Sequence, residues 1–246
     1  MKVSIITATY NSAATIADTV RSVQQQTYPD IEHIFIDGLS KDETVTIIRS
    51  LHNGPVVSEK DKGIYDAMNK GIRYACGEIV GILNSDDFYP SATVIEKVVE
   101  LFKITACDIV YGDLLYVDGT DTTKIKRRWI SGAYKPNSFL YGWMPPHPTF
   151  FIRKECYEKF GMFNLNLGSA ADYELMLRML YRHRLKAAYL PEEVVHMRTG
   201  GVSNQTLQNR LLANRNDRLA WKVNDMRPYF FTLYLKPLRK IVQFFH

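Results

Sequence analysis

Cysteine is scarce in this chain of 246 residues, which has only Cys76, Cys107 and Cys156. Their number is odd, they lie far apart, and none belongs to a C-x-x-C pair. This spacing argues against a disulfide framework and against a zinc site, and it is typical of a protein in a reducing compartment.

Long apolar runs and several signature motifs are also missing. No stretch of about 20 apolar residues occurs, so we expect no membrane-spanning helix, and the run at Val3–Ile6 is too short for a signal peptide. These absences predict a cytoplasmic protein. The lack of a Walker pattern, of G-x-G-x-x-G and of G-x-S-x-G argues against the usual phosphate-loop, dinucleotide-binding and serine-hydrolase classes.

The net charge of +5 is unevenly placed. One basic cluster comprises Lys124, Lys126, Arg127 and Arg128, and a second lies in residues 227–240. Such clusters either bind anionic partners or form solvated faces, and the residues alone leave both interpretations open. No nucleic-acid recognition motif accompanies them, so we expect no nucleic-acid partner.

Strand-like and helix-like segments alternate through the first hundred residues. This alternation predicts an α/β fold with a parallel sheet covered by helices on both faces. Strands are expected at Val3–Ala8, Glu32–Ile36, Val56–Val57 and Ile79–Leu83, and helices after a capping Ser12, at Asp42–Leu51 and at Ile64–Ala75.

The second half is less regular. We expect a strand at Asp108–Val117, a loop leading into a buried strand within Pro145–Arg153, and an amphipathic helix at Ala171–Tyr181. Beyond about residue 205 the chain is expected to be helical, with Pro237 interrupting any single helix.

Polar residues follow each strand of the first half. Thr9 and Tyr10 follow the first strand, Asp37 the second, Asp61 lies after the third, and Asn84–Asp87 follows the fourth. Right-handed crossovers bring the carboxyl ends of such strands to one edge, where ligands of open α/β sheets bind. Four polar clusters at one edge predict a ligand site.

Asp86 and Asp87 are the most informative of these residues. Adjacent carboxylates after a buried strand repel each other unless a cation compensates, and Mg²⁺ or Mn²⁺ binds such oxygens together with substrate phosphates. The alternative is that Asn84–Asp87 only turns the chain before Pro90.

Asp172 and Glu174 form a second acidic pair, at the start of an expected helix. They are either acids favoured by the helix dipole or the source of a general base that accepts a hydroxyl proton. Their spacing places them on different sides of the helix, so only one is expected to face the site.

Three further residues are candidates. His147, among prolines, is expected to line a pocket on the acceptor side, with Glu174 as a second acceptor-side candidate. His196 is a candidate metal or phosphate ligand, and Arg198, beside Gly200 and Gly201, is a candidate diphosphate clamp. A structural role for each histidine stays open.

Four segments in order, Ser4–Asn11, Asp37–Thr44, Asp61–Gly71 and Leu83–Asp87, resemble the motifs of glycosyltransferase family 2. The likeness extends from residue 1 to about residue 205. It implies a GT-A fold with a Rossmann-like, mostly parallel sheet, and an inverting transfer of sugar from a nucleotide-sugar.

The resemblance also implies roles on the donor side. Thr9 and Tyr10 would border the nucleotide base, and Asp37 and Asp61 would hold the base or the ribose. Arg198 falls in a variable loop that often contacts phosphate.

Other implied roles concern the metal and the base. Asp86 and Asp87 match the acidic cluster that binds the ribose and a divalent cation, Mn²⁺ or Mg²⁺, with His196 as a further ligand. Asp172 matches the expected catalytic base. This sequence departs from the pattern of many members at Asn84, where they carry Asp, and from some at Gly38, where a second Asp lies near the uracil.

The resemblance predicts a metal-dependent hexosyl- or hexosaminyltransferase that uses a UDP-sugar and a glycan or lipid-linked acceptor, in bacterial surface polysaccharide synthesis. We expect a catalytic domain at 1–205, with a donor half (1–105) and an acceptor half (106–205), and a helical basic-aromatic extension at 206–246. Residues 227–246 of the extension are either packed on the protein or docked at the inner face of the cell membrane. A sugar nucleotidylyltransferase or a non-catalytic nucleotide- or glycan-binding module are the alternatives.

Overall fold

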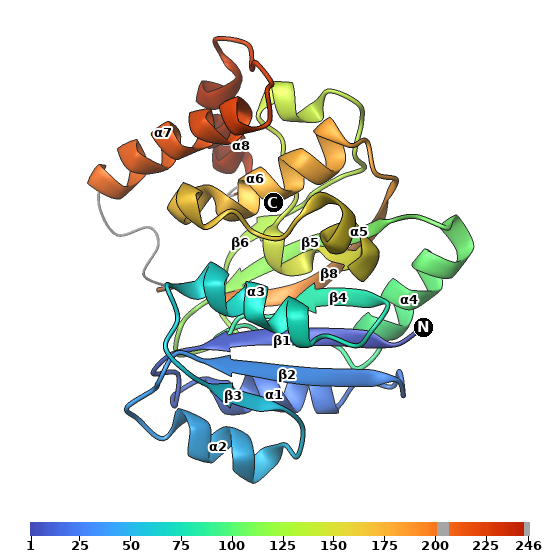
Figure 1. The fold of residues 1–246 in the computed structure, drawn as a ribbon, viewed down its shortest axis with the longest axis vertical. Coiled ribbons are helices and arrows are strands. Elements are labelled where there is room, and N and C mark those ends of the chain that lie inside the picture. The colour runs from blue at the N-terminus through green and yellow to red at the C-terminus, as the bar shows by residue number, and fades with distance from the viewer. Residues whose placement is uncertain (201–206, 244–246) are drawn as a thin grey trace.

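A computed structural model describes residues 1–200 and 207–243 of the chain and shows a mixed sheet with helices on both faces (Figure 1). The strand order is β3-β2-β1-β4-β7-β5-β6, and β8 pairs with β5. The strands of the described residues are β1 (Val3–Thr9), β2 (Ile31–Asp37), β3 (Val56–Ser58), β4 (Ile79–Ile82), β5 (Ile109–Val117), β6 (Ile125–Trp129), β7 (Phe151–Arg153) and β8 (Ala187–Arg198).

Four parallel strands, β3, β2, β1 and β4, form the first half of the sheet. Their side chains alternate between two cores, because Ile6 packs with the helix α3 while Val3 and Ile5 pack with the helix α4. Burial on both faces explains the uninterrupted apolar runs. The first helices are α1 (Ile16–Gln24), α2 (Thr44–Leu51), α3 (Ile64–Tyr74) and α4 (Val94–Thr105).

The second half makes the sheet mixed. β7 runs antiparallel to β4 and β5, β6 runs antiparallel to β5, and β8 runs parallel to β5. The helices on this side are α5 (Lys154–Phe160), α6 (Ala171–Met176) continued by a π-helical segment (Leu177–Arg182), α7 (Leu207–Val223) and α8 (Thr232–Val242). The predicted α/β class is confirmed, and antiparallel pairs join the expected parallel ones.

Two predicted details were wrong. Ser12 does not cap α1, since the N-cap is Thr15 and the Ser12 hydroxyl lies 2.8 Å from that of Ser85 instead. Pro237 does not interrupt α8. Proline removes one backbone hydrogen bond, and this helix is also held by packing, with Leu233 buried and Thr232 donating to the Leu140 carbonyl at 2.6 Å.

The first basic cluster lies on and beside the edge strand β6. Lys124 pairs with Asp121 at 3.0 Å, Lys126 with Asp118 at 3.0 Å, and Arg128 with Glu193 at 2.5 Å. Charges on an edge strand prevent pairing with other chains. Across residues 1–200 and 207–243, no helix is long and apolar enough to cross a bilayer.

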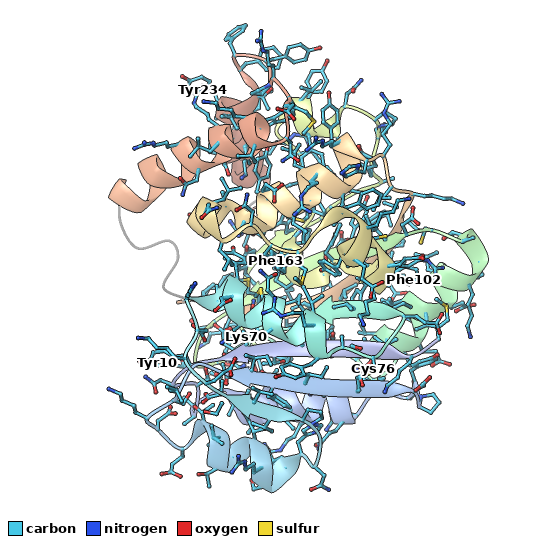
Figure 2. All side chains as sticks on the ribbon, viewed as in Figure 1. Tyr10, Lys70, Cys76, Phe102, Phe163 and Tyr234 are labelled. Carbon is cyan, nitrogen blue, oxygen red and sulfur yellow. The ribbon has the colours of Figure 1, made fainter. Side chains whose placement is uncertain are left out.

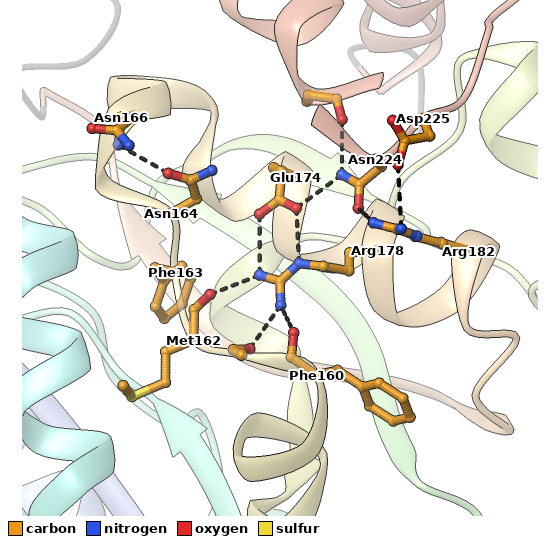
Figure 3. A network of polar contacts seen from close by, with 12 residues as sticks. Phe160, Met162, Phe163, Asn164, Asn166, Glu174, Arg178, Arg182, Asn224 and Asp225 are labelled. Carbon is orange, nitrogen blue, oxygen red and sulfur yellow. Dashed lines mark hydrogen bonds and ion pairs between the residues drawn. The ribbon is translucent and has the colours of Figure 1, made fainter. Parts of the chain in front are cut away.

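A buried ion pair ties the second-half helices together (Figure 3). The Glu174 carboxylate accepts two hydrogen bonds from Arg178, at 2.8 and 3.1 Å, and one from Asn224 of the segment after α7, at 2.9 Å. Arg178 also donates to the carbonyls of Phe160 and Met162. The end of α5, the helix that carries Glu174 and Arg178, and the segment after α7 therefore meet at this ion pair.

Replacing Glu174 with Ala should lower the free energy of unfolding by about 3–5 kcal/mol, because it leaves the Arg178 charge buried without its partner. Urea unfolding measures the change. Glu158→Ala is the matched control, since Glu158 is 65% exposed and pairs loosely with Lys154 at 3.6 Å. Equal losses in the two variants would contradict the assignment.

Candidate active site

The carboxyl ends of the parallel strands gather the predicted donor residues at one edge of the sheet. Thr9 at the end of β1 lies in register with Asp37 at the end of β2, and the Thr9 hydroxyl donates to the Asp37 carboxylate at 3.1 Å. Figure 2 shows Tyr10 at this edge, and its side chain is 59% exposed.

Asp37 is fully buried, and protein donors occupy both of its carboxylate oxygens. Besides Thr9, the Ser40 backbone N–H donates to it at 3.1 Å and the Ser58 hydroxyl at 2.6 Å. Asp37 therefore fixes the loops that follow three strands.

Tyr10, Gly38 and Asp61 meet at one point of the edge. A Cβ atom on Gly38 would lie 2.6 Å from Oδ2 of Asp61 and 3.5 Å from the Tyr10 ring. The Asp61 carboxylate also accepts a hydrogen bond from the Gly63 N–H at 2.8 Å. The absence of a side chain at residue 38 thus lets an aromatic ring and a carboxylate come together, which suits recognition of a base and a ribose.

Asp86 and Asp87 follow β4 and differ in their surroundings. Asp87 is fully buried, its Oδ2 accepts a hydrogen bond from the Asn84 amide at 2.8 Å, and its Oδ1 has no hydrogen-bond partner among the described residues. Burial raises the pKa of Asp87 well above its ordinary value, and the Asp86 charge raises it further. Burial also raises the pKa of Asp86, against the opposing effect of Arg198.

A divalent cation fits this pair. Hard cations take one or two carboxylates and complete their coordination with water and phosphate oxygens, and the orphaned Oδ1 atom of Asp87 lacks such a partner. Asn84 supplies a donor to Asp87 and not a third negative charge.

The structure does not bring His196 into this pair. Within the described ranges, no three His, Cys, Asp or Glu side chains are grouped so that they could hold a metal ion. The His196 ring lies 3.2 Å from the Glu193 carboxylate, and its backbone forms a bridge with Phe88. Because the His196 imidazole faces Glu193, the predicted metal site of three residues, Asp86, Asp87 and His196, does not form in the described part of the structure.

Arg198 lies directly beside the acidic pair. Its guanidinium donates to the Asp86 carbonyl at 2.8 Å and pairs with Asp18 of α1 at 2.5 Å. It also lies over the Phe88 ring, 5.1 Å from its centroid. The cation predicted to contact diphosphate is therefore held next to the carboxylates, with a counter-ion that sequence reasoning missed.

Asp172, at the start of α6, is partly buried within reach of Tyr65 and His147. Tyr65 of α3 lies within electrostatic reach of the Asp172 carboxylate, and burial together with this carboxylate raises the pKa of Tyr65 far above its usual range. Burial lowers the pKa of His147, and the Asp172 charge opposes that effect. An uncharged imidazole and a phenol thus flank one carboxylate.

Tyr116 of β5 lies within electrostatic reach of both acidic centres. Its pKa is raised mainly by burial, and the charges of Asp87 and Asp172 both add to the rise. The Arg127 guanidinium lies over the Tyr116 ring, 3.8 Å from its centroid. Asp87 and Asp172 therefore face a common region although 85 residues separate them in the sequence.

The structure separates Glu174 from this region. As predicted, Asp172 and Glu174 lie on different sides of the helix, but Glu174 is 2% exposed and bound to Arg178. Its candidate role on the acceptor side is therefore wrong, because its carboxylate is committed to the buried ion pair.

Helix α3 joins this edge of the sheet to the region around Asp172, a role that sequence reasoning missed. The Asn69 side chain exchanges two hydrogen bonds of 2.9 Å with the Phe163 backbone, and the Tyr65 ring lies 5.3 Å from the Phe163 ring. Figure 2 shows Phe163 between α3 and the second-half helices. The spacing of Tyr65 and Asn69 by four residues, on one helix face, was the available signal.

Sequence comparison identifies relatives over most of the chain. The family described as Glycosyl transferase family 2 matches residues 4–164. A PGL/p-HBAD biosynthesis glycosyltransferase of Mycobacterium bovis is 29% identical over 218 residues, covering 85% of this chain and 82% of the relative. An uncharacterized glycosyltransferase of Mycobacterium tuberculosis is 30% identical over 194 residues, covering 72% of this chain and 68% of the relative.

Solved structures share the fold. Staphylococcus aureus TarS 1–349 in complex with UDP has a TM-score of 0.70 at 18% identity, over 98% of this chain and 72% of that chain. The mannosyltransferase PcManGT of Pyrobaculum calidifontis, in complex with GDP-Man and Mn²⁺, has a TM-score of 0.66 at 19% identity, over 96% and 68%. This chain spans 41% of the longer TarS chain. With the family matched over residues 4–164 and the sheet order described above, the chain belongs to glycosyltransferase family 2 and has the GT-A fold.

Proposed function

We propose that the chain is an inverting glycosyltransferase in which Asp172 is the catalytic base and the Asp86–Asp87 pair holds the donor diphosphate through a divalent cation. The observation that carries this proposal is the position of Tyr116, within electrostatic reach of both Asp87 and Asp172. A direct displacement requires the leaving group and the catalytic base to lie at the same reacting carbon, and the shared region meets this requirement.

On the donor side, Tyr10 and Asp61 would contact the base and ribose, with Thr9 and Asp37 holding the loops that carry them. Asp86 would contact the ribose or the metal. Arg198, fixed by Asp18 at 2.5 Å, would place positive charge beside the diphosphate.

The cation, Mn²⁺ or Mg²⁺, would be held by Asp86 and Asp87 and would stabilise negative charge on the leaving group when bound. Asn84 fixes Oδ2 of Asp87, so Oδ1 is the oxygen left to bind it. The solved neighbour that contains Mn²⁺ and GDP-Man shares this fold.

On the acceptor side, a hydroxyl oxygen would attack the anomeric carbon while the bond to the diphosphate breaks, and the hydroxyl proton would pass to Asp172. Tyr65 orients that carboxylate, and His147 is buried beside it without charge. Attack opposite to the leaving group inverts the anomeric centre. The presence of this base favours catalysis over a binding module.

We also propose a hexosyl- or hexosaminyltransferase that uses a UDP-sugar and a glycan or lipid-linked acceptor of bacterial surface polysaccharide synthesis. Names of similar proteins support this class, since one acts in PGL/p-HBAD biosynthesis and one was solved with UDP-GlcNAc. We assign residues 1–105 to donor binding, 106–205 to the acceptor and 206–246 to an extension.

We also propose that the extension contacts the inner face of the cell membrane as a peripheral membrane segment. One side of α8 packs on the protein, while the side chains of Phe230, Tyr234 and Leu238 are 85%, 59% and 54% exposed. Exposed Arg227 precedes them in the sequence. Aromatic and basic side chains together suit the interface of an anionic bilayer. Phe244 and Phe245, which also suggested this contact, lie outside the described residues.

Changing Asp172 to Asn should lower the transfer rate on the order of 10²–10⁴-fold, because the amide cannot accept the hydroxyl proton. Calorimetric titration of the nucleoside diphosphate should show unchanged affinity, since Asp172 lies on the acceptor side. Unchanged transfer rates would reject Asp172 as the base.

Mn²⁺ with a nucleoside diphosphate should raise the melting temperature of the wild type but not that of Asp87→Asn. The variant lacks a carboxylate that binds the metal, and a ligand raises the melting temperature only of a protein that binds it. Without metal, the variant should melt no lower than the wild type, since a buried charge has been removed. Asp225→Asn, at a side chain 87% exposed, is the control and should keep the full shift. An equal shift in both variants would refute the metal assignment.

The triple variant Phe230→Ser, Tyr234→Ser and Leu238→Ser should lose most sedimentation with anionic liposomes, because it removes the exposed apolar side chains without removing a buried one. Ile104→Ser is the control, since Ile104 is 72% exposed at the end of α4. Wild-type sedimentation of the triple variant would reject membrane contact through α8.

A further inference from the structure

A cavity lies outside the proposed donor site and outside the region of the proposed catalytic base Asp172. It has a volume of about 550 Å³ and is formed by β6, the loop that follows it, and α8. Its walls are cationic and aromatic, and they include Arg128, Trp129, Trp143, Lys236, Arg239 and Gln243. The motifs that define the donor edge do not contribute to it.

The charge of the cavity is positive. Three basic side chains and no carboxylate line it. Arg128 and Lys236 are held from behind by Glu193 at 2.5 Å and Asp217 at 2.7 Å. Arg239 donates its Nε–H to the Tyr141 carbonyl at 3.0 Å, and no carboxylate of the described residues pairs with it. Arg239 is therefore the cation best placed to meet an anion.

The other walls suit a sugar ring. The indole N–H of Trp143 donates to the Ser131 carbonyl at 2.7 Å, so the ring offers the cavity only its apolar surface. Trp129 adds a second indole. The side-chain oxygen Oε1 of Gln243, a residue 9% exposed, is buried without a partner in the described structure. Such an acceptor needs a donor, which a sugar hydroxyl supplies.

We propose that this cavity is an acceptor subsite for a saccharide that carries an anionic group, a carboxylate or a phosphate. Arg239 binds the anion, the indoles of Trp129 and Trp143 cover the C–H face of the ring, and Gln243 accepts a hydroxyl hydrogen bond. This inference rests on the proposed function, because an acceptor saccharide exists only if the chain is a glycosyltransferase.

The cavity and the proposed base share structural elements. Met144 lines the cavity, and three residues later His147 lies within reach of Asp172. The Lys236 ammonium group lies 3.7 Å from the centroid of the Tyr173 ring, next to Asp172 in sequence. In this proposal, one residue of an oligosaccharide occupies the cavity and another presents its hydroxyl toward Asp172.

The arrangement of α8 favours a saccharide over a lipid headgroup. Lys236, Arg239 and Gln243 recur at helical spacing and line the cavity, whereas the exposed Tyr234 and Leu238 lie on nearly the opposite face of the helix. A bilayer that contacts the exposed face does not meet the cavity wall.

The test titrates the full chain, without nucleotide, with three probes: a glucuronate-containing disaccharide, a disaccharide phosphate and neutral cellobiose. At least one acidic probe should bind about tenfold or more tightly than cellobiose, since a hydrogen bond to a charged group contributes about 1.5–3 kcal/mol. Arg239→Gln should remove that preference and keep the affinity for the nucleoside diphosphate. Arg227→Gln, at an exposed arginine outside the cavity, is the matched control and should bind as the wild type does.

Three outcomes would overturn the inference: equal binding of acidic and neutral probes, equal effects of Arg239→Gln and Arg227→Gln, or displacement of a bound acidic probe by anionic vesicles. Melting temperatures of both variants show whether they fold. Binding of the nucleoside diphosphate is measured separately. If only the cavity assignment is wrong, that binding remains; if the proposed function is wrong, that binding is absent.

Discussion

Two adjacent carboxylates at the end of a buried strand impose the strongest constraint on this structure. Asp87 is fully buried with one oxygen unpartnered, and Asp86 lies next to it. Desolvation raises the pKa of both groups, and the Asp86 charge raises the pKa of Asp87 further, so their ionised forms require positive charge nearby. Arg198 provides part of it, and the Asp18 carboxylate and the Asp86 carbonyl hold its guanidinium in place. A cation and a diphosphate complete the charge balance in our account.

The second constraint is that the sheet edge with Asp86 and Asp87 and the region around Asp172 must be held in one frame. Helix α3 serves this purpose, because Asn69 binds the Phe163 backbone and Tyr65 lies within electrostatic reach of Asp172. The Glu174–Arg178 pair then fixes the helix that carries Asp172 against the loop after α5. Catalytic groups from distant parts of the sequence thus depend on a small number of buried polar contacts.

Much of the first half could be predicted from sequence, because buried parallel strands leave continuous apolar runs such as Ile79–Ile82, and the polar residues after them must meet at one edge. The strands β6 and β8 could not be predicted from the sequence. β6 is a charged edge strand, and β8 contains Pro191 and a register shift that obscure its periodicity. Glu174 and His196 were assigned to a site by residue type, and their partners, Arg178 and Glu193, became visible only in three dimensions.

The central claim is a single displacement at the anomeric carbon, with the nucleoside diphosphate leaving. Water acts as a slow acceptor in such a site, so the stereochemistry can be followed without knowing the natural one. NMR of the chain with Mn²⁺ and α-linked UDP- or GDP-sugars should show slow release of nucleoside diphosphate and the β-anomer of the sugar as the first product. The α-anomer as first product, or no release from any donor, would contradict the account.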